Sequence, residues 1–165
     1  MTADAIKQRQ RLLLKTYLDQ YCKMKRRMDS LKWRLADARN ALSSPSIRSG
    51  ISNAIPAKGN VSDGAAAPIL REETISERFE RERTQCAAIM GEVLDTLDLL
   101  PLSPRREILE YRHIDGLRWK EISGKLDISH ATCRRRYERG IDELLALRPV
   151  QARLAAFETR RKRDG

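Results

Sequence analysis

The first 42 residues carry a long amphipathic pattern that glycine and proline do not interrupt. Apolar residues recur there in alternating steps of three and four positions: Leu14, Tyr17, Tyr21, Met24, Met28, Leu31, Leu35, Ala38 and Leu42. This spacing is the heptad seam of a coiled coil. It predicts one helix from about Asp4 to Leu42, on the order of 55 Å long at about 1.5 Å per residue.

A second seam predicts another helix from about Glu72 to Leu100. Its inward positions are Phe79, Arg83, Cys86, Met90, Val93, Leu97 and Leu100. Folded back antiparallel on the first helix, it sets Leu35 opposite Phe79. The same register brings residues 1–42, with a net charge of +7, beside residues 72–100, with a net charge of −5. We therefore predict an antiparallel coiled-coil hairpin, although a homo-oligomeric coil of the first helix is an alternative.

Between these helices, residues 43–71 collect Ser, Gly, Pro, Asn and Ala without a sustained period. This composition is typical of a flexible linker that joins separate elements.

Residues 101–147 carry the signals of three short helices. Ser103 is placed to cap the first, with Pro104 at its first position, and Gly116 is placed to end it in a left-handed turn. Residues 127–129 form a three-residue turn before the third helix, with Ser129 as its N-cap. Two helices joined in this way make a helix-turn-helix. The fold class predicted is therefore all-α, a coiled-coil hairpin followed by a C-terminal helix-turn-helix.

The apolar pattern also predicts what this segment buries. The third helix is expected to bury Cys133, Tyr137, Ile141, Leu144 and Leu145. Trp119 is expected to pack between the first two helices, and His113 to lie at the surface. In the basic tail, residues 148–165, one face of a short helix is marked by Val150, Leu154 and Phe157.

This segment resembles sigma-70 region 4 of bacterial sigma factors over about 45 residues. The matching residues are Arg106, Leu109, Tyr111, Arg112, Asp115, Gly116, Leu117, Glu121, Ile122, Leu126, Ile128, Ser129, Thr132, Arg136 and Leu144. Two positions depart from the family pattern, because Cys133 replaces a Val or Ile and Gly140 replaces an Ala. Nothing in residues 1–100 resembles region 2 of a sigma factor, which melts promoter DNA.

The resemblance and the helix geometry together predict contact with double-stranded DNA. We expect His130, Ala131 and Arg135 to face base edges in the major groove. Thr132, Arg134 and Arg136 flank that stripe and are better placed for phosphates. The remaining predicted contacts are Ser129, Arg118 and Lys120, the last two reaching a phosphate from the preceding helix.

Charge and composition agree with a polyanionic partner. The formal net charge is +10 and the sequence pI is about 9.9. The three cysteines are far apart, and neither histidine has metal-ligand spacing with them, so we expect no zinc site, no cofactor and no disulfide framework. No nucleophile or carboxylate pair accompanies the histidines, so we expect no enzymatic activity. With neither a membrane span nor a signal peptide in view, a cytoplasmic location is expected.

The whole layout is similar to ArpU/RinA-type phage and prophage transcriptional regulators. That resemblance implies binding upstream of late genes, and contact with RNA polymerase. Two alternatives remain open. A small terminase subunit also combines a helix-turn-helix, coiled-coil helices and basic charge, although usually in the opposite order. A coiled-coil interaction protein could use its helix-turn-helix for protein contacts alone.

Overall fold

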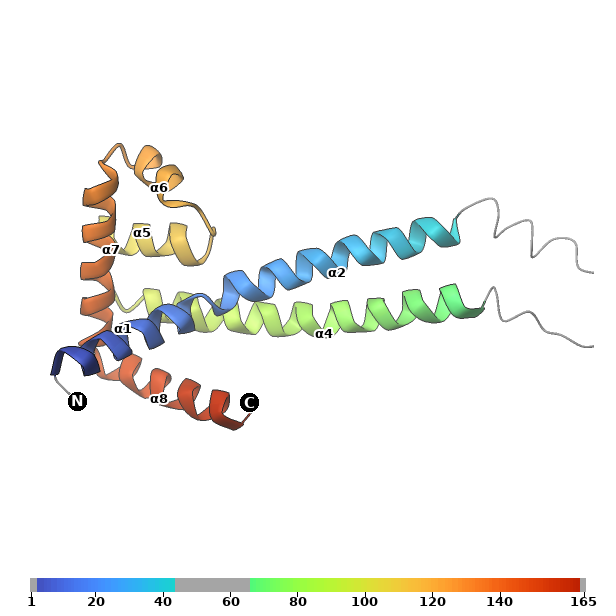
Figure 1. Cartoon of the computed structure of the whole chain (residues 1–165), viewed down its shortest axis with the longest axis horizontal. Helices are drawn as coiled ribbons and strands as arrows, with labels where there is room; N and C mark the ends of the chain where they lie inside the picture. The colour runs from blue at the N-terminus through green and yellow to red at the C-terminus, as the bar shows by residue number, and fades with distance from the viewer. Residues whose placement is uncertain (1–2, 44–65, 164–165) are drawn as a thin grey trace, which may run out of the picture. The chain divides into compact units, whose positions relative to one another are not determined.

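The computed structural model describes residues 3–43 and 66–163, and within them every regular element is a helix (Figure 1). In chain order these are α1 (Ala3–Leu18), α2 (Gln20–Leu42), α4 (Ala66–Leu97), α5 (Pro104–His113), α6 (Trp119–Lys125), α7 (His130–Leu145) and α8 (Arg148–Arg163). The predicted all-α class and the C-terminal helix-turn-helix are confirmed. The chain divides into two units, whose described residues are 3–23 with 87–163, and 24–43 with 66–86.

The single helix expected over residues 4–42 is instead two helices that meet at Asp19. The backbone N–H of Asp19 donates to the carbonyl of Lys15 at 3.0 Å, and its carbonyl accepts from Lys23 at 3.1 Å. The turn is therefore bent rather than unwound, since its hydrogen bonds largely continue through the bend. At this break the Asp19 side chain is bonded outside its own helix, to His113.

In the first unit, α1 packs against α7 and α8 (Figure 1). Leu14, Tyr17 and Leu18 of α1 are at most 1% exposed. They share one core with residues from the end of α4, from the loop that follows it and from α5 to α8: Val93, Leu97, Leu100, Ile108, Leu109, Ile122, Cys133, Tyr137, Ile141, Leu144, Val150, Leu154 and Phe157. The first turns of the predicted coiled-coil seam thus belong to the core of the helix-turn-helix unit.

The loop from α5 to α6 turns at Gly116, as the sequence predicts. Its φ is +72°, in the left-handed region where a Cβ is unfavourable. At the other end of α5, the Ser103 hydroxyl accepts from the N–H of Arg106 at 3.4 Å, with proline in the first turn. The residues that define both ends of α5 can therefore be recognised from the sequence alone.

Replacing Gly116 with alanine is expected to lower the free energy of unfolding by about 1–2 kcal/mol, the cost of the left-handed conformation for an L-residue. The space itself is not limiting, because a Cβ there would lie 3.5 Å from Cys22 Sγ, an ordinary contact. Gly116→Asn should lose less, since asparagine tolerates this region. Chemical denaturation followed by circular dichroism measures both, and an equal loss for the two variants would argue against backbone strain as the cause.

Gly140 allows α7 to approach α5 closely. A Cβ at this position would lie 2.9 Å from Cδ1 of Leu109, whose side chain is fully buried, so that side chain would have to shift. The departure from the alanine of the family pattern therefore coincides with tight packing between these two helices.

In the second unit, α2 and the first part of α4 run antiparallel. Arg27 donates to Glu82 at 2.9 Å and Arg39 donates to Glu72 at 2.8 Å, so advancing along α2 means going back along α4. The expected pairing of Leu35 with Phe79 is shifted by about one helical turn. The inward positions of this unit include Met24, Leu31, Leu35 and Cys86, which are buried.

The positions of α4 that are buried also differ from those of the predicted seam. Glu82 is buried at 8% exposure, whereas Arg83, expected in the seam, is exposed and pairs with Glu80 at 2.8 Å. Arg27 and Arg78 both donate to Glu82 Oε1, which offsets part of the cost of burying the carboxylate. Of the predicted linker, residues 44–65 lie outside the described residues, and 66–71 belong to α4.

Candidate nucleic-acid interface

A tight turn and a side-chain cap position the start of α7. Asp127 adopts a φ of +48°, and the N–H of Ile128 donates to the carbonyl of Ser123 at 3.1 Å. The hydroxyl of Ser129 accepts from the N–H of Thr132 at 3.1 Å. Aspartate is one of the few residues that tolerate this backbone region, and serine is a favoured N-cap. The turn therefore fixes the direction in which α7 leaves α6.

The first turns of α7 have one buried and one exposed face. Cys133, Tyr137, Ile141 and Leu144 are buried, as predicted, while Leu145 is half-buried. The predicted base-reading residues His130, Ala131 and Arg135 are exposed, together with Arg134; Thr132 and Arg136 are half-buried on the flanks. Positions three and four apart share a helix face, so the exposed residues form one stripe.

Farther along α7, the same stripe is covered by α1. Lys15 donates to Glu138 at 2.6 Å, and Arg11 donates to Asp142 at 2.7 Å through Nε. The hydrogen bond from Arg11 lowers the pKa of Asp142. The exposed face of α7 is thus basic in its first two turns, whereas Glu138 and Asp142 farther along are paired with α1 and Arg139 stays exposed.

Two of the residues predicted to contact DNA lie at the start of α6. Arg118 and Lys120 are exposed on either side of Trp119. The N–H of Arg118 donates to Glu121 Oε2 at 2.6 Å, which fixes the entry into the helix.

The cations around this surface lack carboxylate partners. Among the described residues, no ion pair involves Arg118, Lys120, Arg134, Arg135 or Arg136. In contrast, the cations of α1 that face α7 and α8 are paired with Asp142, Glu138 and Glu158. The positive charge at the front of α7 is therefore uncompensated, as a surface for a polyanion requires.

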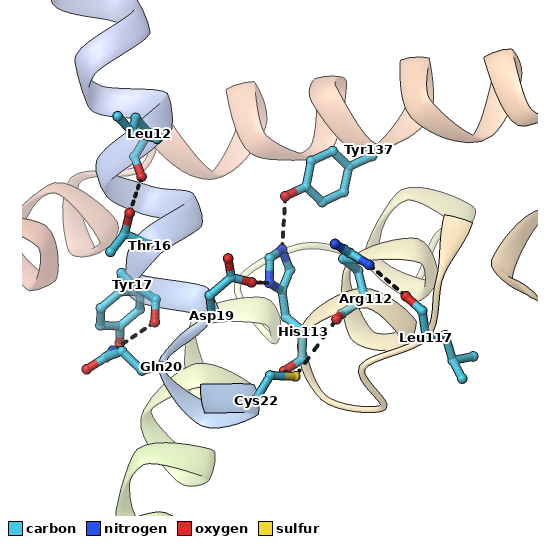
Figure 2. Close-up of polar contacts among 10 residues, drawn as sticks. All are labelled: Leu12, Thr16, Tyr17, Asp19, Gln20, Cys22, Arg112, His113, Leu117 and Tyr137. Atoms are coloured by element: carbon cyan, nitrogen blue, oxygen red, sulfur yellow. Dashed lines mark hydrogen bonds and ion pairs between the residues drawn. The ribbon is translucent and has the colours of Figure 1, made fainter. Parts of the chain in front are cut away.

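Behind this surface lies a buried polar group that the sequence did not reveal. His113, expected at the surface, is only 1% exposed (Figure 2). Its Nδ1 lies 2.9 Å from Asp19 Oδ1, and its Nε2 lies 3.0 Å from the hydroxyl of Tyr137. The expectation failed because His113 follows Leu109 by four positions and shares its buried face. That spacing was the available signal.

The two partners set the roles of the imidazole. A carboxylate only accepts, so Nδ1 donates to Asp19, and in the neutral tautomer Nε2 accepts from Tyr137. Burial raises the pKa of Tyr137. Burial has the largest single effect on the pKa of Asp19 and acts to raise it, but the hydrogen bond from His113 and the nearby cations Arg112 and Lys23 together lower that pKa below its ordinary value. Nearby, the thiol of Cys22 donates to the carbonyl of His113 at 3.1 Å (Figure 2).

Trp119 has different neighbours from those expected. It stands edge-on to Tyr137 of α7, with ring centroids 4.9 Å apart. The guanidinium groups of Arg112 and Arg134 both lie over its ring, at 5.0 Å and 5.1 Å from the centroid. Trp119 thus connects α5, α6 and α7, rather than filling the space between the first two alone.

This geometry, a capped and exposed helix behind a fixed turn, is that of a helix-turn-helix DNA-binding domain. Residues 90–144, about a third of the chain, match the family model of sigma-70, region 4, which identifies this segment as a region 4 domain. The matched segment begins within α4, ahead of the expected start at residue 101. No curated protein and no solved structure matches the chain.

The described residues contain neither a membrane-spanning helix nor a metal-binding cluster. None of their helices has the length and apolar character needed to cross a membrane. No cluster of three or more His, Cys, Asp and Glu residues in them could hold a metal ion. Cys86 and Cys133 are buried thiols that form no disulfide.

Proposed function

We propose that this protein is a sequence-specific transcriptional regulator that reads the major groove of DNA through the first two turns of α7. The observation that carries the proposal is the exposed stripe of His130, Ala131, Arg134 and Arg135 behind the Ser129 cap. Its cations lack carboxylate partners among the described residues, and the stripe belongs to a region 4 domain. Region 4 is a DNA-binding domain rather than a catalytic one, which fits a regulator and not an enzyme.

The residues have distinct roles in this proposal. His130, Ala131 and Arg135 contact base edges, with Arg135 able to bind a guanine bidentately and Ala131 a thymine methyl group. Arg134, Arg136 and Thr132 contact phosphates beside the groove. Arg118 and Lys120 approach the backbone from α6, and Ser129 fixes the N-terminal turn.

The wider setting follows from the resemblance in layout to phage regulators. We place the protein in the cytoplasm of a bacterial or phage-infected cell, acting upstream of late genes. Contact with RNA polymerase is part of the same proposal, because the domain is of the sigma region 4 type. Mapping bound DNA in cells tests the setting. Sites upstream of a late operon would support it, and sites at a packaging origin would favour a terminase-like role instead.

The proposed roles predict different effects for two neighbouring arginines. Selection from a pool of random duplexes should first yield a preferred sequence for the full chain. Arg135→Ala should then relax the preference at one base pair by about 1–3 kcal/mol. Arg134→Ala should weaken binding to all duplexes alike and reduce the salt slope of log affinity by about one. Fluorescence anisotropy over a salt series measures both effects.

Arg26→Ala serves as the matched control, because Arg26 is an exposed arginine of α2 and its loss changes the net charge equally. It should leave affinity and preference nearly unchanged. If Arg134→Ala and Arg135→Ala both behaved like Arg26→Ala, this surface of α7 would not be the DNA interface. A large ring in a mass measurement, without a preferred sequence, would favour the packaging alternative.

A further inference from the structure

Two arginines from different helices contact the ring of Trp119. Arg112 at the end of α5 and Arg134 in α7 place their guanidinium groups 5.0 Å and 5.1 Å from the centroid of its ring. Neither arginine forms an ion pair with a carboxylate of the described residues. Two like charges therefore gather on one aromatic ring at the edge of the proposed DNA interface.

The ring itself is held in place. Tyr137 packs edge-on against it, with an interplanar angle of 83°. Arg112, which lies over the ring, also donates from Nη1 to the carbonyl of Leu117 at 2.9 Å (Figure 2). Trp119 thus contacts neighbours on both α5 and α7, and its ring is the surface over which the guanidinium of Arg134 lies.

Stacking on tryptophan restricts an arginine that would otherwise sample many rotamers in solvent. A guanidinium over an indole face is attracted by the ring quadrupole, and it keeps its N–H groups at its edge for other acceptors. Arg134 is exposed, and its contact with Trp119 directs it from α7 toward the start of α6. In helix-turn-helix proteins, the DNA backbone runs beside the recognition helix on such a flank.

We propose that Trp119 is a positioning residue of the DNA interface, which holds the guanidinium of Arg134 on its ring in the orientation that binds a DNA phosphate. This inference rests on the proposed function and adds a residue that makes no contact with DNA itself. A phosphate at this position also relieves the repulsion between the two guanidinium groups.

A purely structural role for Trp119 makes a different prediction. If the ring only filled space among α5, α6 and α7, its loss would disturb α7 as a whole. The base preference that Arg135 provides and the affinity for DNA would then both decrease. A positioning role acting through Arg134 instead lowers affinity for every duplex, reduces the salt slope, and leaves the base preference intact.

A double-mutant cycle on the full chain tests this role, with the duplex selected as described above. Trp119→Leu and Arg134→Ala should each lower affinity about 3–10-fold at moderate salt, and the double variant should lose little more than Arg134→Ala alone. Trp119→Leu combined with Arg135→Ala should show the product of the two single effects. Trp119→Phe, which keeps an aromatic face, should restore most of the affinity and of the salt slope.

Failure of this inference and failure of the proposed function would give different results. If the effects of Trp119→Leu and Arg134→Ala multiplied fully, Trp119 would not act through Arg134 and the inference would be overturned while DNA binding stood. If neither Arg134→Ala nor Arg135→Ala changed the affinity, the proposed function itself would fail.

A measurement without DNA covers the case in which Trp119→Leu does not fold. The chain has two tryptophans, and Trp33 is exposed, so Trp33→Phe leaves Trp119 as the only indole reporter. In that background, Arg134→Ala should increase acrylamide quenching of Trp119, because it uncovers the ring, and Arg135→Ala should not. Equal quenching in the two variants would overturn the stacking on which the inference depends.

Discussion

Replacing Tyr17 with alanine is expected to lower the free energy of unfolding of the unit that contains the helix-turn-helix by about 3–5 kcal/mol. Tyr17 lies far from that motif in sequence, yet it is 1% exposed and its ring stands edge-on to Phe157 at a centroid distance of 5.5 Å. Its hydroxyl lies 3.2 Å from the carbonyl of Glu92 and 3.2 Å from Thr96 Oγ1. The substitution removes all of these contacts and leaves a cavity.

Thermal denaturation followed by circular dichroism measures the effect, at about 2–4 °C for each kcal/mol in a chain of this size. Tyr17→Phe should cost only about 1 kcal/mol, because it removes the hydroxyl alone. Leu12→Ala is the control on the same helix, since Leu12 is 67% exposed and its loss should be nearly neutral. A loss in Tyr17→Ala no larger than that in Leu12→Ala would mean that α1 is not part of this core.

Replacing His113 with phenylalanine is expected to cost about 1–3 kcal/mol, although the ring is retained and the site becomes more apolar. The reason is that the Tyr137 hydroxyl, 3.0 Å from Nε2, would lose its partner in a buried position. Asp19 should contribute less to the loss, because its side chain is 46% exposed and water can replace the imidazole. The measurement is the free energy of unfolding from denaturant titration.

A second substitution separates this cause from simple repacking. Tyr137→Phe alone should cost about 1 kcal/mol, and adding it to His113→Phe should recover part of the stability, because no unpaired hydroxyl then remains. If the double variant were less stable than the unsubstituted protein by the sum of the two single effects, the hydrogen bond between the two rings would not be the source of the loss.

The helix-turn-helix could be predicted from sequence because its signals are local. Ser103, Gly116 and Ser129 act within a few residues of their own positions, and the structure assigns them the caps and the left-handed turn that the pattern indicated. The inward face of α7 follows from the same short-range periodicity. These features need no knowledge of which distant segment packs against them.

The docking of α1 could not be predicted in this way. A seam such as the one through Leu14 and Tyr17 shows that one face is buried, but not what covers it. The first turns of that seam lie in the core with α7 and α8, and the seam breaks at Asp19, whose partner His113 is 94 positions away. Long-range pairs of this kind leave little trace in a single sequence.

The register of the hairpin was missed for a related reason. Heptad seams repeat every seven residues, so a shift by about one turn keeps apolar positions facing each other and basic residues beside acidic ones. The ion pairs of Arg27 with Glu82 and Arg39 with Glu72 resolve the register. A buried Glu82 in the seam, in place of Arg83, was not expected from residue type.

The sharing of one core by α1 and α8 has a consequence for how the chain acquires its fold. Arg9 and Glu158, which pair across these two helices, are separated by 149 positions. During synthesis, α1 leaves the ribosome before α7 and α8, so the part of its apolar face that packs on those helices has no native partner until they have followed. Contacts of such long range are slow to form even between helices. We therefore expect the region 4 segment, if expressed as residues 90–144 alone, to expose the surface that α1 and α8 cover.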